Sequence, residues 1–258
     1  MTPGTNRNTA PVSAAAYAEA AAAAVHRVST DQADGVAKAA ALLVDALRAG
    51  GVVQAFGTGH SQALAMEIAG RAGGLVPTNM IALRDLVILG GDPPDVLFTE
   101  HLERDPAVAH RIYELAGVHP SDVFVMASNS GGNGSVVELA RLVKDRGHGL
   151  VAITSMAHSS QVTSRHPSGL RLFEIADVVL DNGAPYGDAV LSTGEIAVGG
   201  ISSITAALLA QMVVAEVVRT MLAAGETPPV YLSANIPEGD AHNSALEARY
   251  AGRIRRSA

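Results

Sequence analysis

Residues 52–62 have the sequence Val-Val-Gln-Ala-Phe-Gly-Thr-Gly-His-Ser-Gln, and this stretch decides the fold class. Residues 52–56 form a short apolar run that is typical of a buried strand, and the glycines that follow indicate a tight turn. Residues 62–71 then have a helical pattern. The same order of strand, polar turn and helix occurs again at residues 123–146, where Ser-Asn-Ser-Gly-Gly-Asn forms the turn. The chain is therefore built from repeated strand–turn–helix units.

The remaining apolar runs extend this pattern over most of the chain. Strands that are apolar throughout and alternate with helices indicate a mostly parallel sheet that is covered by helices on both faces. We expect one large domain over residues 13–258, preceded by a flexible terminus at residues 1–12. The further strands are expected at residues 75–77 with 80–83, 150–154 and 178–180, and the further helices at residues 106–116, 135–146 and 203–224.

Two helices are expected before the first strand. The first covers residues 13–28 and is rich in alanine. The second begins near Asp31, a suitable N-cap, and ends at Gly50-Gly51. Such a helix pair can provide a dimer surface or can pack on the sheet of its own chain. One face of the second helix is expected to be buried, with Val36, Ala39, Ala40, Leu43, Val44 and Leu47.

The composition excludes several classes of protein. The 258-residue chain has a net charge of −7 and contains five Tyr, four Phe and no Trp, which argues against a nucleic-acid binder. The chain has no Cys, so disulfides and thiolate sites are excluded, and a reducing cytoplasm is the expected location. The longest apolar stretch, residues 204–218, is interrupted by Gln211 and Glu216 and is too short to span a bilayer. The histidines lack metal-ligand spacing, so we expect no metal and no cofactor.

Three turns rich in serine and glycine precede helices, at residues 57–61, 128–133 and 199–203. Hydroxyl groups and backbone N–H groups at such a turn can bind an anion such as phosphate. Because the first two turns follow strands of a parallel sheet, they belong at the same edge of that sheet, where ligands bind in such folds. None of the turns contains a lysine, which excludes a Walker phosphate loop, and Gln62 breaks the dinucleotide-binding fingerprint.

The sequences Gly57-Thr58-Gly59-His60-Ser61, Ser128-Asn129-Ser130-Gly131-Gly132-Asn133 and Ser202-Ser203 together resemble the sugar isomerase (SIS) domain family. The resemblance covers residues 31–222. It implies a three-layer α/β/α sandwich, flavodoxin-like or Rossmann-like, that forms a homodimer or homotetramer and binds a phosphorylated sugar. It also implies that Ser61, Ser128 and Ser130 bind the phosphate, with Ser202 and Ser203 nearby. The other turn residues expected around the substrate are Gly57, Gly59, His60, Asn129, Gly131 and Asn133.

An aldose–ketose isomerase needs a general base and an acid for the ring oxygen. Glu67 lies six residues after Ser61 and precedes Gly70-Arg71, as a catalytic glutamate precedes a similar pair in phosphoheptose isomerases; it can also be an ordinary solvated carboxylate. His242 lies in a polar segment, and the family often places such a histidine over the sugar, sometimes from the partner subunit. Glu195 is a further acidic candidate. Glu103 and Arg104 are expected to form a surface or interface pair.

Three alternatives remain open on the sequence. A phosphosugar sensor without catalysis and a lyase acting on an amino-sugar phosphate would use the same pocket. A serine hydrolase would use Ser61, Asp181 and His242, because the turn resembles a nucleophile elbow and the chain order matches. The basic tail with Arg249, Arg253, Arg255 and Arg256 is expected to be a solvated end or a weak partner contact.

Overall fold

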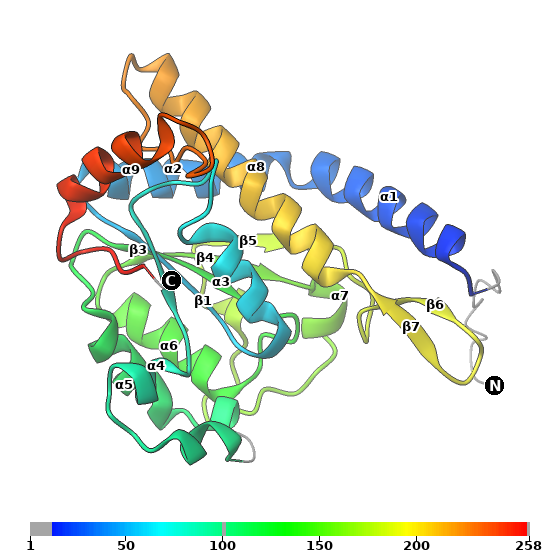
Figure 1. Cartoon of the computed structure of the whole chain (residues 1–258). Helices are drawn as coiled ribbons and strands as arrows, with labels where there is room; N and C mark the ends of the chain where they lie inside the picture. The colour runs from blue at the N-terminus through cyan, green and yellow to red at the C-terminus, as the bar shows by residue number, and fades with distance from the viewer. Residues whose placement is uncertain (1–11, 100–101, 257–258) are drawn as a thin grey trace.

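The centre of the molecule is a five-stranded parallel sheet, shown in Figure 1, in a computed structural model that describes residues 12–99 and 102–256. The strand order is β2-β1-β3-β4-β5, with every neighbouring pair parallel. The chain therefore moves from β1 to one edge and then crosses back to β3, which places a crevice between the carboxyl ends of β1 and β3. The strands are β1 (Val53–Gly57), β2 (Thr78–Ile81), β3 (Val123–Ala127), β4 (Gly149–Thr154) and β5 (Val178–Asp181).

Helices cover both faces of the sheet, which confirms the predicted three-layer α/β/α sandwich. Side chains of β3 alternate between the faces: Val123 and Val125 pack in one apolar cluster, and Phe124 and Met126 pack in the other. The first cluster includes α2 (Ala33–Arg48), α3 (Gln62–Ile68) and α8 (Ser202–Ala223), and the second includes α5 (Ala107–Ala116) and α6 (Gly134–Asp145). The predicted apolar face of the second helix is buried in full.

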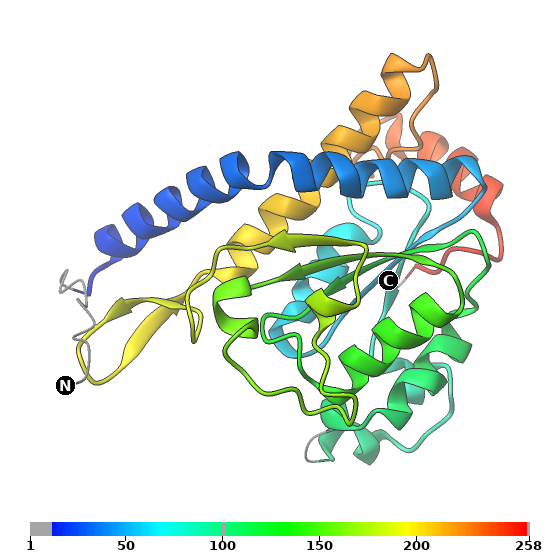
Figure 2. The same ribbon diagram turned by 180° about the vertical axis from the view of Figure 1, so that it is seen from behind.

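Helix α1 (Ala14–Asp31) and the antiparallel hairpin of β6 (Ala189–Ser192) and β7 (Ala197–Gly200) project together from the body, as Figures 1 and 2 show. The hydroxyl of Tyr17 joins the two by donating to the carbonyl oxygen of Gly200, at 2.7 Å. We call α1 with this hairpin the arm. The N-cap predicted at Asp31 is wrong, because α1 continues through Asp31 and Gln32 caps α2.

Two segments differ from their predicted structure. The glycine-rich stretch before α8 forms the β6–β7 hairpin, and the polar segment around His242 forms helix α9 (Gly239–Glu247). Neither has the apolar periodicity on which helix and strand predictions rest. Of the flexible terminus predicted at residues 1–12, residues 1–11 lie outside the described part. The short elements are α4 (Asp85–Ile88), α7 (Met156–Ser159), η1 (Gly59–Ser61), η2 (Pro94–Phe98), η3 (Leu102–Arg104), η4 (Leu172–Glu174) and η5 (Ala248–Tyr250).

Helix α8 is longer than the apolar stretch inside it. Its 22 residues form a helix long and apolar enough to cross a membrane, one such helix within residues 12–99 and 102–256. The sequence argument that this stretch is too short therefore does not hold. Leu209, Val213 and Val217 of α8 are buried in the core beside α2 and α3, and a core helix meets the same length and composition test.

Candidate functional site

The first turn reverses the chain directly at the end of β1. A Cβ on Gly57 would lie 2.3 Å from the carbonyl oxygen of Ser61, so any larger residue collides with backbone there. Gly59 has a φ of +54°, a left-handed conformation that glycine adopts without strain. The two glycines therefore let η1 and α3 begin immediately after the strand, which places His60 and Ser61 at the carboxyl edge of the sheet.

The second turn, after β3, is held by its own side chains and by the segment that follows β4. The Ser128 hydroxyl accepts a hydrogen bond from the Gly131 N–H at 3.0 Å. The Thr154 hydroxyl donates to the Ser128 carbonyl, and the Ser159 hydroxyl donates to the Ser130 carbonyl, each at 2.7 Å. The Ser128 hydroxyl and the carbonyl groups of this turn therefore stabilise the conformation of the turn itself.

The third turn carries an internal anion. The carboxylate of Asp188 accepts hydrogen bonds from the Ile201 N–H at 3.1 Å, the Ser202 N–H at 2.8 Å and the Ser202 hydroxyl at 2.9 Å. Asp188 itself has a φ of +70°. These donors at the start of α8 are thus already engaged, and Ser203 keeps its hydroxyl without a hydrogen bond to any described residue.

Residues from all three turns nevertheless line one cavity of about 120 Å³. Asn182, which follows β5, completes the ring; its amide donates to the side-chain oxygen of Asn129 at 2.9 Å. Sequence reasoning missed Asn182, although its position in an Asp-Asn-Gly turn after a strand was a usable signal. The cavity has apolar residues of α3 and α8 on its walls, and its polar lining consists of His60, Ser61, Glu67, Asn129, Asn182, Ser202 and Ser203.

Several residues expected around a substrate do not line this cavity. Asn133 accepts a hydrogen bond from the Arg165 guanidinium at 2.8 Å, and Ser128 bonds within its own turn. Both side chains therefore form hydrogen bonds with other parts of the protein and do not line the cavity. Gly57 and Gly59 shape the first turn as described. Of the expected residues, those absent from the lining are Gly57, Gly59, Ser128, Ser130, Gly131, Asn133 and His242.

Glu67 of α3 lines the cavity. Its Oε1 accepts a hydrogen bond from the Gln211 amide at 2.8 Å, and the same oxygen forms an ion pair with Arg71. Only 24% of the Glu67 side chain is exposed. The carboxylate is therefore oriented from two sides, by α8 and by its own helix, rather than free in solvent.

The remaining candidates lie elsewhere in the chain. His242 is exposed on α9, and its Nε2 lies 2.9 Å from the Val230 carbonyl oxygen. Asp181 accepts from the N–H groups of Met156 and Gly183, at 3.0 and 2.9 Å. Since His242 bonds to neither Ser61 nor Asp181, the structure does not assemble the hydrolase triad within this chain. Glu195 is exposed between β6 and β7, outside the cavity.

Glu103, expected as part of a surface or interface pair, lies beside the first turn, a position that the sequence did not indicate. A Cβ on Gly59 would lie 3.8 Å from its Oε2, so the Glu103 carboxylate lies beside the first turn. The Ser135 hydroxyl holds the Glu103 carbonyl at 2.7 Å, at the start of α6. No ion pair joins Glu103 to Arg104 among the described residues, and the buried Nε of Arg104 has no partner there.

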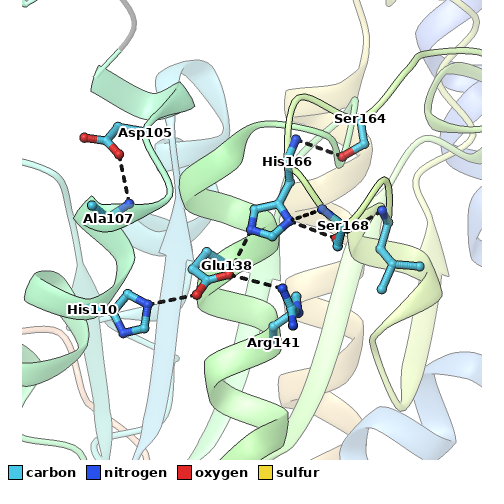
Figure 3. A network of polar contacts seen from close by, with 9 residues as sticks. Asp105, Ala107, His110, Glu138, Arg141, Ser164, His166 and Ser168 are labelled. Carbon is cyan, nitrogen blue, oxygen red and sulfur yellow. Dashed lines mark hydrogen bonds and ion pairs between the residues drawn. The ribbon is translucent and has the colours of Figure 1, made fainter.

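A network around Glu138, shown in Figure 3, fastens the segment after β4 to α6. One carboxylate oxygen of Glu138 lies 2.8 Å from Nε2 of His110, and the other lies 2.8 Å from Nε2 of the buried His166. Burial by itself would raise the pKa of Glu138, but the hydrogen bonds from the two histidines outweigh it, so this pKa is below its ordinary value. The segment so fastened is the one that holds the second turn.

A metal site is not formed by the part of the chain that the structure describes: no group of three or more His, Asp or Glu side chains there could hold an ion. The polar lining of the cavity consists of hydroxyls, amides, one imidazole and one carboxylate. Such a set can bind a small anion or a polyhydroxylated ligand through hydrogen bonds, and its carboxylate can accept a proton.

Comparison with known proteins places the chain in a family. Residues 16–155 match the SIS domain model. The UPF0309 protein lmo0025 of Listeria monocytogenes is 41% identical over 86% of this chain and 91% of its own length, and UPF0309 protein BH3325 of Halalkalibacterium halodurans is 37% identical over 86% and 91%.

Solved structures share the fold at low identity. The phosphoheptose isomerase of Francisella tularensis has a TM-score of 0.54 at 17% identity, covering 79% of this chain and 95% of its own. Phosphoheptose isomerase GmhA of Neisseria gonorrhoeae has a TM-score of 0.50 at 21% identity, with the same coverage. These likenesses show the shared fold, and the match of the family model to more than half of the chain shows that the protein belongs to the SIS domain family.

Proposed function

We propose that this protein binds a phosphorylated sugar in the cavity where the three turns meet, and that it interconverts an aldose phosphate and a ketose phosphate. The observation that carries the proposal is one cavity lined by polar side chains from the ends of β1, β3 and β5 and the start of α8, with Glu67 on its wall. Family membership supports it, and so does the shared fold with proteins named phosphoheptose isomerases.

Neutral donors would hold the phosphate. No lysine or arginine lines the cavity, so the phosphate would be bound by the hydroxyls of Ser61 and Ser203, the His60 ring and the Asn129 amide. The side chains of His60 and Ser61 make no hydrogen bond with any described residue, so a ligand displaces no internal contact there. Ser202 differs, because Asp188 already holds its hydroxyl.

Glu67 would be the general base. Aldose–ketose isomerisation removes a proton from the carbon beside the carbonyl and returns it to the neighbouring carbon, which one carboxylate can do. Glu67 is six residues beyond Ser61, or ~9 Å along the helix axis, which suits a ligand whose phosphate lies at Ser61 and whose reacting carbons lie several bonds away. The amide of Gln211 orients the carboxylate for this step.

We further propose that the protein is a homodimer or larger homo-oligomer that associates through the arm. Ile196 is 63% exposed and Ile204 is 40% exposed, at and beside the hairpin. Association of two copies would bury these side chains. His242 does not line the cavity of its own chain, so it would need a second copy to reach a sugar. Light scattering after gel filtration tests this association. Ile196→Asp should lower the molar mass of the assembly, and an unchanged molar mass would argue against association through the arm.

Thermal-shift measurements with hexose, heptose, pentose and amino-sugar phosphates test the binding. A true ligand raises the melting temperature, and Ser61→Ala should reduce that rise. Ser160→Ala is the matched control, because the exposed Ser160 hydroxyl makes no hydrogen bond with the described residues. If no sugar phosphate shifts the wild type, or if both variants respond equally, the cavity is not the phosphosugar site.

Turnover of the ligand found in this way separates catalysis from sensing. Glu67→Gln should keep the thermal shift and lose isomerisation followed by proton NMR in deuterated water. Gln preserves the size and the contact with Gln211 but cannot accept the proton. Loss of binding instead of turnover contradicts the role of Glu67 as base, and a wild type that binds without turnover is a sensor.

A further inference from the structure

The C-terminal tail is bound to the protein, contrary to the expectation of a solvated end. Arg253 forms an ion pair at 2.6 Å with Asp122, whose side chain is fully buried. The Asn79 side chain on β2 bonds the tail twice, donating to the Arg253 carbonyl at 2.8 Å and accepting from the Arg255 N–H at 2.7 Å. The tail is therefore fixed along the edge strand β2.

This placement closes a second cavity, of about 150 Å³, on the other side of α3 from the first. Met66, Ala69 and Gly70 from α3 and the residues after it form one wall, and Met80 of β2 forms another. The polar lining consists of three arginines: Arg84, three residues after the end of β2, and Arg255 and Arg256 of the tail. The cavity thus gathers positive charge, although the chain as a whole has a net charge of −7.

The positive charge of this cavity is only partly compensated. Arg255 lies 3.9 Å from Asp85, and Arg256 lies 3.5 Å from Glu247. The Arg84 side chain forms no hydrogen bond or ion pair with any described residue, although its charge acts on the neighbouring Asp85 carboxylate. Three guanidinium groups thus face two carboxylates, and both of these lie beyond ordinary hydrogen-bond length.

The two tail arginines are held in place by neutral groups. Arg255 donates to the carbonyl oxygen of Leu115 at 3.2 Å. Arg256 donates to the carbonyl oxygens of Val76 and Thr78, and its Nε donates to the Tyr231 hydroxyl. Carbonyl and hydroxyl acceptors orient a guanidinium without neutralising it. The side chains are therefore preorganised, while all five N–H groups of Arg84 and several of Arg255 remain for a ligand.

We propose that this cavity is a second anion site that binds the phosphate or pyrophosphate group of a small metabolite. Guanidinium groups match phosphate oxygens in pairs, which is why arginine is favoured where a phosphate group is recognised. Met66 and Met80 provide an apolar wall for the uncharged part of such a ligand. The site is separate from the sugar-phosphate cavity, which has no arginine in its lining.

Calorimetric titration of the full chain with pyrophosphate at low ionic strength tests the proposal. Arg84→Gln should weaken pyrophosphate binding at this site about tenfold or more, because charged hydrogen bonds are lost. Arg84→Lys should bind with intermediate affinity, since lysine keeps the charge but cannot donate two parallel hydrogen bonds to the phosphate as a guanidinium does. Arg249→Gln is the matched control, a change of another exposed arginine of the C-terminal region that lines neither cavity.

Ser61→Ala separates this site from the proposed sugar-phosphate site. The second site should bind pyrophosphate equally in the wild type and in Ser61→Ala. Equal binding by wild type and Arg84→Gln would overturn the proposal, and so would a wild-type Kd above about 10 mM. Loss of binding in Ser61→Ala alone would assign all of the pyrophosphate to the first cavity and would also overturn it. Because the Arg84 side chain makes no hydrogen bond or ion pair with any described residue, its variants should melt close to the wild type.

Discussion

The turn after β1 and the turn after β3 have similar sequences and follow neighbouring strands, but they use their polar groups differently. In the first turn, His60 and Ser61 make no side-chain hydrogen bond with the described residues and both line the cavity. In the second turn, Ser128 bonds to Gly131, Asn133 bonds to Arg165, and Asn129 alone lines the cavity. A polar group that holds the fold is a poorer ligand-binding group, because a ligand must first displace its partner.

The neighbourhood of each turn explains the difference. The segment after β4 lies against the second turn: Arg165 N–H donates to the Gly132 carbonyl at 2.8 Å, and Leu172 N–H donates to the Gly131 carbonyl at 2.9 Å. The first turn is shaped by Gly57 and Gly59, and the Glu103 carboxylate lies beside it. The second turn is thus a support for the site, and the first turn is its contact surface.

The largest expected effect comes from the geometry of the first turn. Gly57→Ala places a methyl group against the Ser61 carbonyl, which is backbone and cannot rotate away, so we expect a loss of about 3 kcal/mol of stability. The melting temperature should fall by roughly 6–12 °C. Gly147→Ala is the control: its φ of +82° is strained, but nothing lies within 4 Å of a Cβ there, so about 1–2 kcal/mol is expected. Equal losses in the two variants would contradict the steric argument.

A smaller and pH-dependent effect is expected where the support of the second turn is fastened. Glu138→Gln removes the charge that His110 and His166 contact, so about 2 kcal/mol should be lost at neutral pH. Because the pKa of Glu138 is lowered by folding, the unfolded chain binds its proton first as the pH falls. The stabilisation is therefore full above roughly pH 4.3 and disappears as the pH falls through the lower pKa of the folded state.

Urea unfolding of wild type and Glu138→Gln at neutral and acidic pH measures this difference. Arg141→Gln serves as the control, since its contact with Glu138 is 3.7 Å long and should contribute less than about 1 kcal/mol. A difference between wild type and Glu138→Gln that does not shrink as the pH is lowered below roughly 4.3 would contradict the assignment.

The smallest effect compares one serine from each turn. Ser128→Ala leaves the Gly131 N–H without its partner and should cost about 1 kcal/mol, whereas Ser61→Ala should change stability by less than about 0.5 kcal/mol. Sugar-phosphate binding should respond in the opposite order, with Ser61→Ala the more damaging. Denaturant titration and thermal shift measure the two properties on the same pair of variants. If Ser128→Ala weakens sugar-phosphate binding more than Ser61→Ala does, the first turn is not the main contact surface for the ligand.

The layered fold could be predicted in most of its parts because its signals are local. Residues 123–127 were placed as a strand and are β3, and the apolar face of α2 was predicted residue by residue. The hairpin and α9 could not be predicted, because polar, glycine-rich segments lack periodicity and take their structure from long-range contacts. One such contact is the hydrogen bond of the Asn243 side chain with the Leu232 carbonyl at 3.0 Å.

The site was predicted in part. The sequence pointed to Ser61, Asn129, Ser202 and Ser203, which do line one cavity, and to Glu67 on its wall. It could not show that Asp188 engages the third turn, that Asn182 joins the lining, or that Glu103 lies beside Gly59. Those facts depend on side chains far apart in the chain, and each is set by how the loops pack.

The sequence by itself determined the parallel sheet, the positions of the three turns and the family of this protein, because strand periodicity and glycine geometry are properties of short segments. The tertiary structure alone decided which hydroxyls face the cavity and which are bonded internally, and where the arginines of the tail come to lie. The physical reason is that a hydrogen bond or an ion pair acts over a few ångströms, and folding chooses which distant residues come within that range.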